Sequence, residues 1–177
     1  MPGQFSISIK KFVDKTGTQM DDVLKKVLFD ISTKVVTMSP VGNRELWAIN
    51  KPSMGLRTWR IQHGRPELTL KPEGYVGGRF RANWQIGEGT APTGELFEKS
   101  PPASGYPSKD AVLGELQTKI LSAKFGKTYW LVNNLPYAVA LEYGHSHEQA
   151  PAGMVGITMV SAQAMVDKAV AEVKGGA

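Results

Sequence analysis

The period of the hydrophobic pattern changes several times along the chain, and each change predicts a different element. Residues 5–12 carry apolar side chains at every second position, which is typical of a half-buried strand. Residues 79–86 alternate in the same way and predict a second strand. Residues 129–132 predict a third, followed by a turn at Asn133 and Asn134.

The period lengthens at Met20. From there to Val35, apolar residues recur at steps of three and four, which predicts a long amphipathic helix. Thr18 can cap its start, because a threonine hydroxyl accepts a bond from a free backbone N–H of the first turn. Pro40 ends it, since a residue before proline is pushed out of the helical region.

Two further helices are predicted in the second half of the chain. Ser108 can cap the first, and residues 154–173 form the second, with small residues that allow close packing. Between them, residues 136–143 form another apolar piece, which can add a short strand, and residues 144–153 form a polar loop. The first of these helices has a predicted buried stripe of Val112, Leu113, Leu116, Ile120 and Leu121.

Two long segments lack a sustained period. Residues 42–76 are rich in Asn, Pro and Gly and predict an inserted loop or β-excursion, and residues 87–107 predict a mobile loop. A chain of 177 residues with 41% hydrophobic content can bury one core. We therefore predict a single α+β domain over residues 1–177, an antiparallel sheet packed by a long N-terminal helix, a middle helix and a C-terminal helix.

Composition narrows the functional classes. The chain has no cysteine, which excludes disulfides, zinc ribbons, iron–sulfur clusters and thiol nucleophiles. It has 21 basic against 16 acidic residues, and a net charge of +5 favours an acidic partner or nucleic acid nearby. No apolar stretch is long enough for a membrane span, and the alternating N-terminus is unlike a signal peptide. We expect a soluble protein made in the cytosol, without contact with a membrane.

Candidate chemistry is sparse. His145 and His147 lie between Glu142 and Glu148, where they could chelate a divalent cation, although hydrogen bonding in a solvated loop accounts for the same residues. We favour the solvated loop and expect no metal. The sequence contains no nucleophile motif, phosphate loop or acid/base pair, so we also expect neither enzymatic activity nor a cofactor.

Residues 44–65 form a candidate docking surface, because tryptophan and arginine dominate the energetics of interfaces. The residues concerned are Trp47, Arg57, Trp59, Arg60 and Arg65. The same rings could equally fasten the segment to its own domain. Arginines interleaved with an aromatic also suit stacking on a nucleic acid, so a basic nucleic-acid-binding domain is an alternative.

Several motifs, read together, point to a family. They are Ser39-Pro40-Val41, Gly78-Arg79-Phe80-Arg81-Ala82-Asn83-Trp84, Asn133-Asn134-Leu135-Pro136-Tyr137-Ala138, Glu142-Tyr143-Gly144 and Ala150-Pro151-Ala152-Gly153-Met154. This string resembles the tail-completion or head–tail joining family of long-tailed bacteriophages and prophages, also described as neck proteins or minor tail components. The resemblance spans residues 20–170, and the insertion at 42–76 departs from it.

The resemblance implies a small virion protein that forms a ring, usually a homohexamer, after assembly in the cytoplasm of the bacterial host. Its implied partners are head connector or adaptor proteins and tail terminator or tail tube proteins. The basic charge balance would suit a ring whose lumen passes DNA or a surface that meets acidic neighbours. A tail terminator or head-closure subunit is the alternative within phages. The motif residues would act as a scaffold: Pro136 shapes a turn, Gly144 takes a positive φ and Pro151 suits the first turn of the last helix.

Overall fold

The computed structural model describes residues 20–42, 77–144, 146 and 149–175. The predicted strand at 5–12, the predicted helix cap Thr18 and all of the insertion except Gly42 lie outside the described residues.

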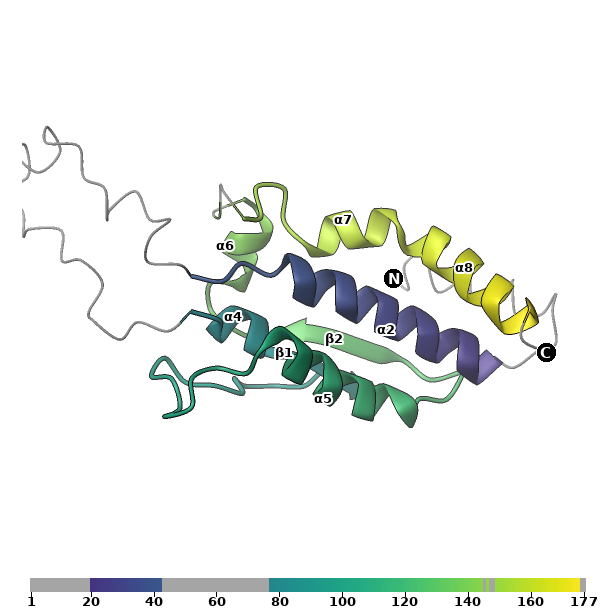
Figure 1. Cartoon of the computed structure of the whole chain (residues 1–177), viewed down its shortest axis with the longest axis horizontal. Coiled ribbons are helices and arrows are strands. Elements are labelled where there is room, and N and C mark those ends of the chain that lie inside the picture. The colour runs from purple at the N-terminus through teal and green to yellow at the C-terminus, as the bar shows by residue number, and fades with distance from the viewer. Residues whose placement is uncertain (1–19, 43–76, 145, 147–148, 176–177) are drawn as a thin grey trace, which may run out of the picture.

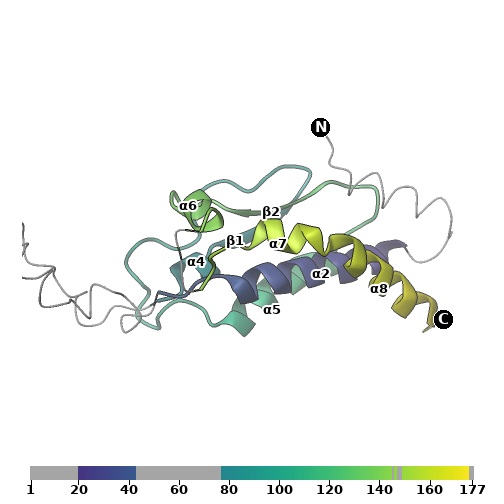
Figure 2. The same ribbon diagram turned by 90° about the horizontal axis from the view of Figure 1, so that it is seen from above.

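The described elements form an α+β fold, as predicted, built around one long helix. α2 (Met20–Met38) lies between α5 (Lys109–Leu121) and α8 (Ala162–Gly175), as Figure 1 shows. A two-stranded antiparallel sheet lies against one side of this helical layer (Figure 2). Its strands are β1 (Trp84–Glu88) and β2 (Tyr129–Asn133).

The long amphipathic helix is confirmed. α2 buries Val27, Val35 and Val36 and ends just before the Ser39–Pro40 pair. Its start is fixed by Asp21, whose carboxylate accepts bonds of 2.8 Å from the Phe125 backbone N–H and from the Lys124 ammonium. The bond from Lys124 is the main reason why the pKa of Asp21 lies below its ordinary value. These contacts place the start of α2 beside the connection that leads into β2.

The strand expected over residues 79–86 is wrong in its first half. α4 (Arg79–Ala82) is a short helix, and β1 begins only at Trp84. The Asn83 side chain donates to the Arg79 carbonyl at 2.8 Å and closes the helical turn. Phe80 of α4 and Trp84, the first residue of β1, meet edge to face at 5.8 Å, so the alternating run spans the junction between a short helix and a strand.

The sheet pairs residues from Trp84↔Asn133 to Glu88↔Tyr129. β2 confirms the predicted third strand and extends it by one residue, Asn133. The capped middle helix is also confirmed, since the Ser108 hydroxyl accepts from the Ala111 N–H at 3.2 Å. Leu121 is wrong as a member of the buried stripe: its side chain is 64% exposed, because α5 ends there and Ala123 fills the next core position.

Residues 136–143 contain a helix instead of a strand. α6 (Ala138–Glu142) begins at a turn in which the Ala138 N–H donates to the Leu135 carbonyl at 2.9 Å. Alanine, leucine and glutamate are strong helix formers, and Pro136 lies in the preceding turn, where its missing N–H is tolerated.

The last helix is two helices, α7 (Val155–Val160) and α8, which meet at Ser161. The Ser161 hydroxyl donates to the carbonyls of Ile157 and Thr158 and accepts from the Lys34 ammonium. β-Branched residues and a glycine make α7 a weak helix former, so a side chain that competes for its carbonyls can end it. Pro151 lies four residues before α7, so the prediction that it lies in the first turn of the last helix is wrong.

Two hydrophobic clusters hold these elements together. The larger joins α2, α4, β1 and α5, and includes Phe80, Trp84 and the fully buried Met154. The smaller lies between Val27 of α2 and Val166 and Ala169 of α8. Ala169 is 1% exposed, so a small residue lets α8 approach α2 closely. Within the described ranges, no helix combines the length and apolar character that a membrane crossing requires.

Candidate interaction surface

Glu142 fixes the geometry of α7. Its Oε2 accepts from the N–H groups of Met154 and Val155, both at 2.9 Å, and its Oε1 accepts from the Gly156 N–H at 2.8 Å. Partial burial alone would raise the pKa of Glu142, but the three backbone donors outweigh it and hold the pKa below its ordinary value. The carboxylate at the end of α6 is therefore the cap of α7, which makes α6 and α7 one unit.

Two glycines allow this close approach. Gly144 has a φ of 84°, as predicted, and Gly153 has a φ of 75°. A Cβ at Gly153 would lie 2.2 Å from the Glu142 carbonyl oxygen, and a Cβ at Gly144 would lie 2.6 Å from the Pro151 carbonyl oxygen. Both positions therefore require glycine for conformation and for space.

The Ser39-Pro40-Val41 motif is tied to two distant segments. Ser39 Oγ accepts from Trp84 Nε1 at 2.7 Å, and both residues are buried. The Val41 N–H donates to Gln149 Oε1 at 2.6 Å, and Gln149 Nε2 donates back to the Val41 carbonyl at 2.9 Å. This role of Gln149 could not be predicted, because its partner lies 108 positions away.

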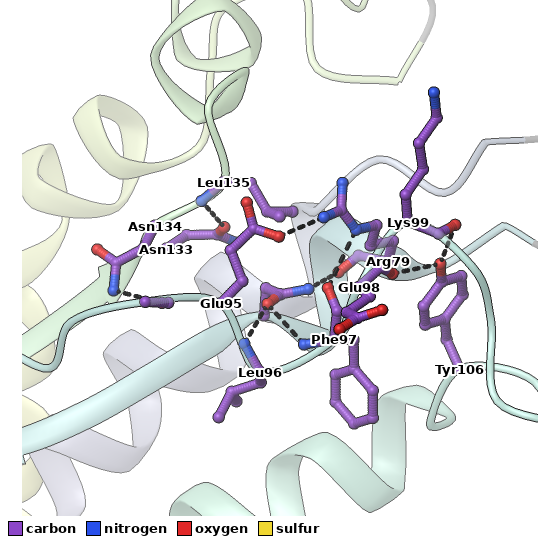
Figure 3. Close-up of polar contacts among 12 residues, drawn as sticks. Arg79, Glu95, Leu96, Phe97, Glu98, Lys99, Tyr106, Asn133, Asn134 and Leu135 are labelled. Atoms are coloured by element: carbon purple, nitrogen blue, oxygen red, sulfur yellow. Dashed lines mark hydrogen bonds and ion pairs between the residues drawn. The ribbon is translucent and has the colours of Figure 1, made fainter.

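Amide side chains anchor the first half of the segment between β1 and α5 (Figure 3). Asn83 Oδ1 accepts from the N–H groups of Leu96 and Phe97 at 2.7 and 3.2 Å, and the residue is completely buried. Asn134 Nδ2 and Gln85 Nε2 both donate to the Gly94 carbonyl at 2.9 Å. The loop predicted over residues 87–107 is therefore wrong at 87 and 88, which belong to β1, and residues 92–97 are hydrogen-bonded to Gln85 of β1 and to Asn83 and Asn134, which flank the sheet.

Arg79 adds to this anchor. Its Nε donates to the Phe97 carbonyl at 3.1 Å, and its guanidinium pairs with Glu95 (Figure 3). The Tyr106 hydroxyl lies at 3.0 and 2.9 Å from the carbonyls of Glu98 and Lys99 and holds the following turn. Asn83, Gln85 and Arg79 therefore act as scaffold. The burial of two amides could not be foreseen, because their partners lie on a segment without a periodic pattern.

Exposed apolar side chains concentrate on α6 and α7. Among the described residues, ten large apolar side chains are exposed, and seven of them lie between positions 137 and 160. We call the following seven the α6–α7 apolar surface: Tyr137, Val139, Tyr143, Val155, Ile157, Met159 and Val160. Val160 is 87% exposed and Tyr143 is 80% exposed, and α7 contains no charged residue. Because these side chains lie on or next to two short helices that Glu142 joins, we take them as the candidate interaction surface.

A groove runs beside this surface, between the second half of α2 and the start of α8. It has a volume of about 510 Å³ and mainly apolar walls. We call it the α2–α8 groove, and its lining consists of Asp30, Thr33, Lys34, Thr37, Met38, Ser161, Ala164, Met165 and Lys168.

The predicted site residues divide into two groups. Those of the family-like motifs are brought together by direct contacts: Asn133 Nδ2 donates to the Phe80 carbonyl at 2.8 Å, and the Phe80 ring lies 6.1 Å from the ring of Tyr137. Pro136 and Tyr143 are exposed, whereas Ala150 and Met154 belong to the larger cluster.

The other group lies outside the described residues. It comprises the candidate docking residues Trp47, Arg57, Trp59, Arg60 and Arg65, together with His145, His147 and Glu148. Within the part of the chain that the structure describes, no three His, Cys, Asp or Glu side chains are grouped so that they could hold a metal ion.

No protein-family model, curated protein or solved structure matches this chain. The resemblance to tail-completion proteins therefore rests on the sequence motifs, and what it implies about function is a proposal.

Proposed function

We propose that this protein is a structural component of a phage or prophage particle that completes or joins the head-proximal end of the tail to the head connector. It acts by assembling into a ring, which the resemblance makes a hexamer, and it carries out no chemical reaction. The observation that carries the proposal is the α6–α7 apolar surface, because exposed apolar side chains grouped on joined helices offer area that a partner protein can cover.

The motifs behind the resemblance build that surface. Glu142 caps α7, and Gly144 and Gly153 permit the contact between the two helices. Val160 and Tyr143 are then presented on a preformed unit, so little ordering opposes their burial in a contact. A neighbouring protein that covered them would gain hydrophobic free energy in proportion to the area removed from water.

The described arginines favour this function over nucleic-acid binding. Arg79 pairs with Glu95 and bonds to the Phe97 carbonyl, so it supports the protein's own fold. Arg81 Nε is buried. The other four arginines of the chain lie in the segment 43–76, outside the described residues. The net charge of +5 suits a ring whose lumen passes DNA.

Removal of the gene from the phage or prophage that encodes it tests the proposal. Electron microscopy should show DNA-filled heads beside unattached or abnormally finished tails, and the wild-type gene supplied separately should restore tailed particles. Tails of uncontrolled length would indicate a terminator, and heads that lose their DNA would indicate a head-closure subunit. Particles of normal number and form would overturn the proposal.

A further inference from the structure

The segment between β1 and α5 displays one leucine between two carboxylates. We call residues 94–98 the Leu96 loop. The Leu96 side chain is 50% exposed, and Glu95 and Glu98 stand on either side of Leu96-Phe97 in the sequence. Asn83 holds the Leu96 and Phe97 N–H groups, so the loop has a fixed shape, and Figure 3 shows the Leu96 side chain pointing away from Arg79 and Tyr106.

The α2–α8 groove has the opposite chemistry. Its walls are mainly apolar, with Met38 of α2 facing Ala164 and Met165 of α8, and it also includes two lysines, Lys34 and Lys168. Lys34 is positioned by its bond to Ser161, and the Lys168 ammonium lies 3.7 Å from Glu172 Oε1 on a side chain that is 65% exposed, where a second carboxylate can reach it. The groove has a volume of about 510 Å³ and is largely open to solvent, so a side chain from another molecule can reach its walls. The groove therefore fits an apolar side chain that arrives with a carboxylate beside it.

The two features lie on different sides of the molecule. The segment that contains the Leu96 loop lies on the α4 and α5 side of α2, and the groove lies on its α8 side (Figure 1). A contact between them must therefore join two copies head to tail. Contacts of this type close into a ring when the rotation between successive copies allows it.

We propose that the Leu96 loop of one copy binds in the α2–α8 groove of the next copy. This inference rests on the proposed ring assembly and identifies the two surfaces that build the ring. Glu95 already pairs with Arg79, so the carboxylate that meets the groove ammonium groups is that of Glu98, whereas loop against loop would bring like charges together. Asp30, the acidic residue of the groove lining, is outnumbered by these two lysines.

A contact with one anchoring side chain is weak by itself. A closed ring repeats it at every interface, so the ring is more stable than a single pair of copies. The free protein should therefore be mostly monomeric when dilute and associate as its concentration rises.

Cross-linking tests the contact, because the chain has no native cysteine. Equal amounts of Leu96→Cys and Ala164→Cys are mixed at high concentration with a short bismaleimide. The matched control replaces Ala164→Cys with Ala171→Cys, an exposed alanine two turns further along α8 and outside the groove lining. A cross-linked dimer of the first pair, severalfold above the control, is expected. Equal yields in the two mixtures would overturn the contact, as would efficient dimers from Leu96→Cys alone.

A charge exchange provides the second arm. Glu98→Lys in the Leu96→Cys copy should lower the yield severalfold, and Lys168→Glu in the Ala164→Cys copy should restore it. Glu115→Lys, an exposed glutamate on α5, controls for the change in net charge. Failure of the exchange to restore the yield would contradict the assigned polarity of the contact.

The two proposals fail separately. Tail defects after gene removal, without the specific cross-link, would leave the function standing and remove this contact. The specific cross-link, together with normal particles after gene removal, would support this contact and remove the proposed function.

Discussion

Trp84 Nε1 donates a hydrogen bond of 2.7 Å to Ser39 Oγ, across 45 positions of the sequence. Ser39 Oγ in turn donates to the Val35 carbonyl at 2.9 Å, so the indole is joined to the last turn of α2. The two residues belong to separate motifs, and their contact connects the end of the long helix to the start of β1. A buried indole N–H needs a partner, and here the serine is that partner.

Ser39→Ala should lower the free energy of unfolding by about 1–3 kcal/mol, because it leaves the Trp84 N–H buried without an acceptor. Urea denaturation measures the change. Trp84→Phe removes the donor, so the double variant should lose less than the sum of the two single losses. Strictly additive losses would show that the hydrogen bond contributes nothing.

Glu142→Gln should destabilise the protein by about 1–2 kcal/mol at neutral pH, because a neutral amide is a poorer acceptor for three backbone N–H groups. The folded-state pKa of Glu142 lies below its ordinary value of 4.5. The stability that this carboxylate adds is therefore complete above that value and is lost as the pH falls through the lower, folded-state pKa.

The gap in unfolding free energy between wild type and Glu142→Gln should accordingly close on acidification below pH 4.5. Urea titrations at a series of pH values measure it. A gap that stays constant down to low pH would contradict the capping role of the carboxylate.

Gly153→Ala should be far more damaging than Gly89→Ala. Both glycines have a φ of 75°, so both substitutions carry the left-handed strain of about 1–2 kcal/mol. A Cβ at Gly153 would also collide with the Glu142 carbonyl, whereas a Cβ at Gly89 meets nothing within 4 Å. We expect Gly153→Ala to lose at least about 2 kcal/mol more in thermal or urea unfolding. Equal losses would mean that α6 and α7 do not need to approach so closely.

Asn83→Ala should release the Leu96 loop, since the N–H groups of Leu96 and Phe97 lose their acceptor. A protease specific for glutamate should then cut after Glu95 or Glu98 about tenfold faster or more. Gln117→Ala, on the exposed face of α5, is the control. Unchanged cleavage would show that the other anchors hold the loop without Asn83.

The elements that could be predicted are those whose buried positions follow the spacing of apolar residues in the sequence. α2 and α5 present one apolar face to the core, and Ser108 caps α5 as its residue type suggests. The predictions were wrong where a polar side chain overrides the pattern. Asn83 closes a helical turn inside an alternating run, and Ser161 interrupts a continuous helical pattern by bonding to the preceding carbonyls.

The site was predictable only as a set of motifs. Glycines and prolines in the run 133–154 indicate tight geometry, and Gly144 has the expected positive φ. The partner of Glu142 could not be foreseen, because its three donors are backbone N–H groups more than ten positions away. The exposure of Val160 was equally hidden, since an apolar residue on a short helix looks like a core residue until the packing of the helix is known.

Val160→Glu tests the central claim, that this chain works through its α6–α7 apolar surface in joining head and tail. Leu121→Glu is the matched control, because Leu121 is also a largely exposed aliphatic residue but lies on α5, outside the α6–α7 apolar surface. Each variant replaces the native gene, and electron microscopy counts DNA-filled heads that carry a tail. We expect Val160→Glu to lower that fraction by at least about tenfold, equivalent to about 1.4 kcal/mol of contact energy, and Leu121→Glu to leave it unchanged. A wild-type fraction of tailed heads with a stably folded Val160→Glu protein would contradict the account.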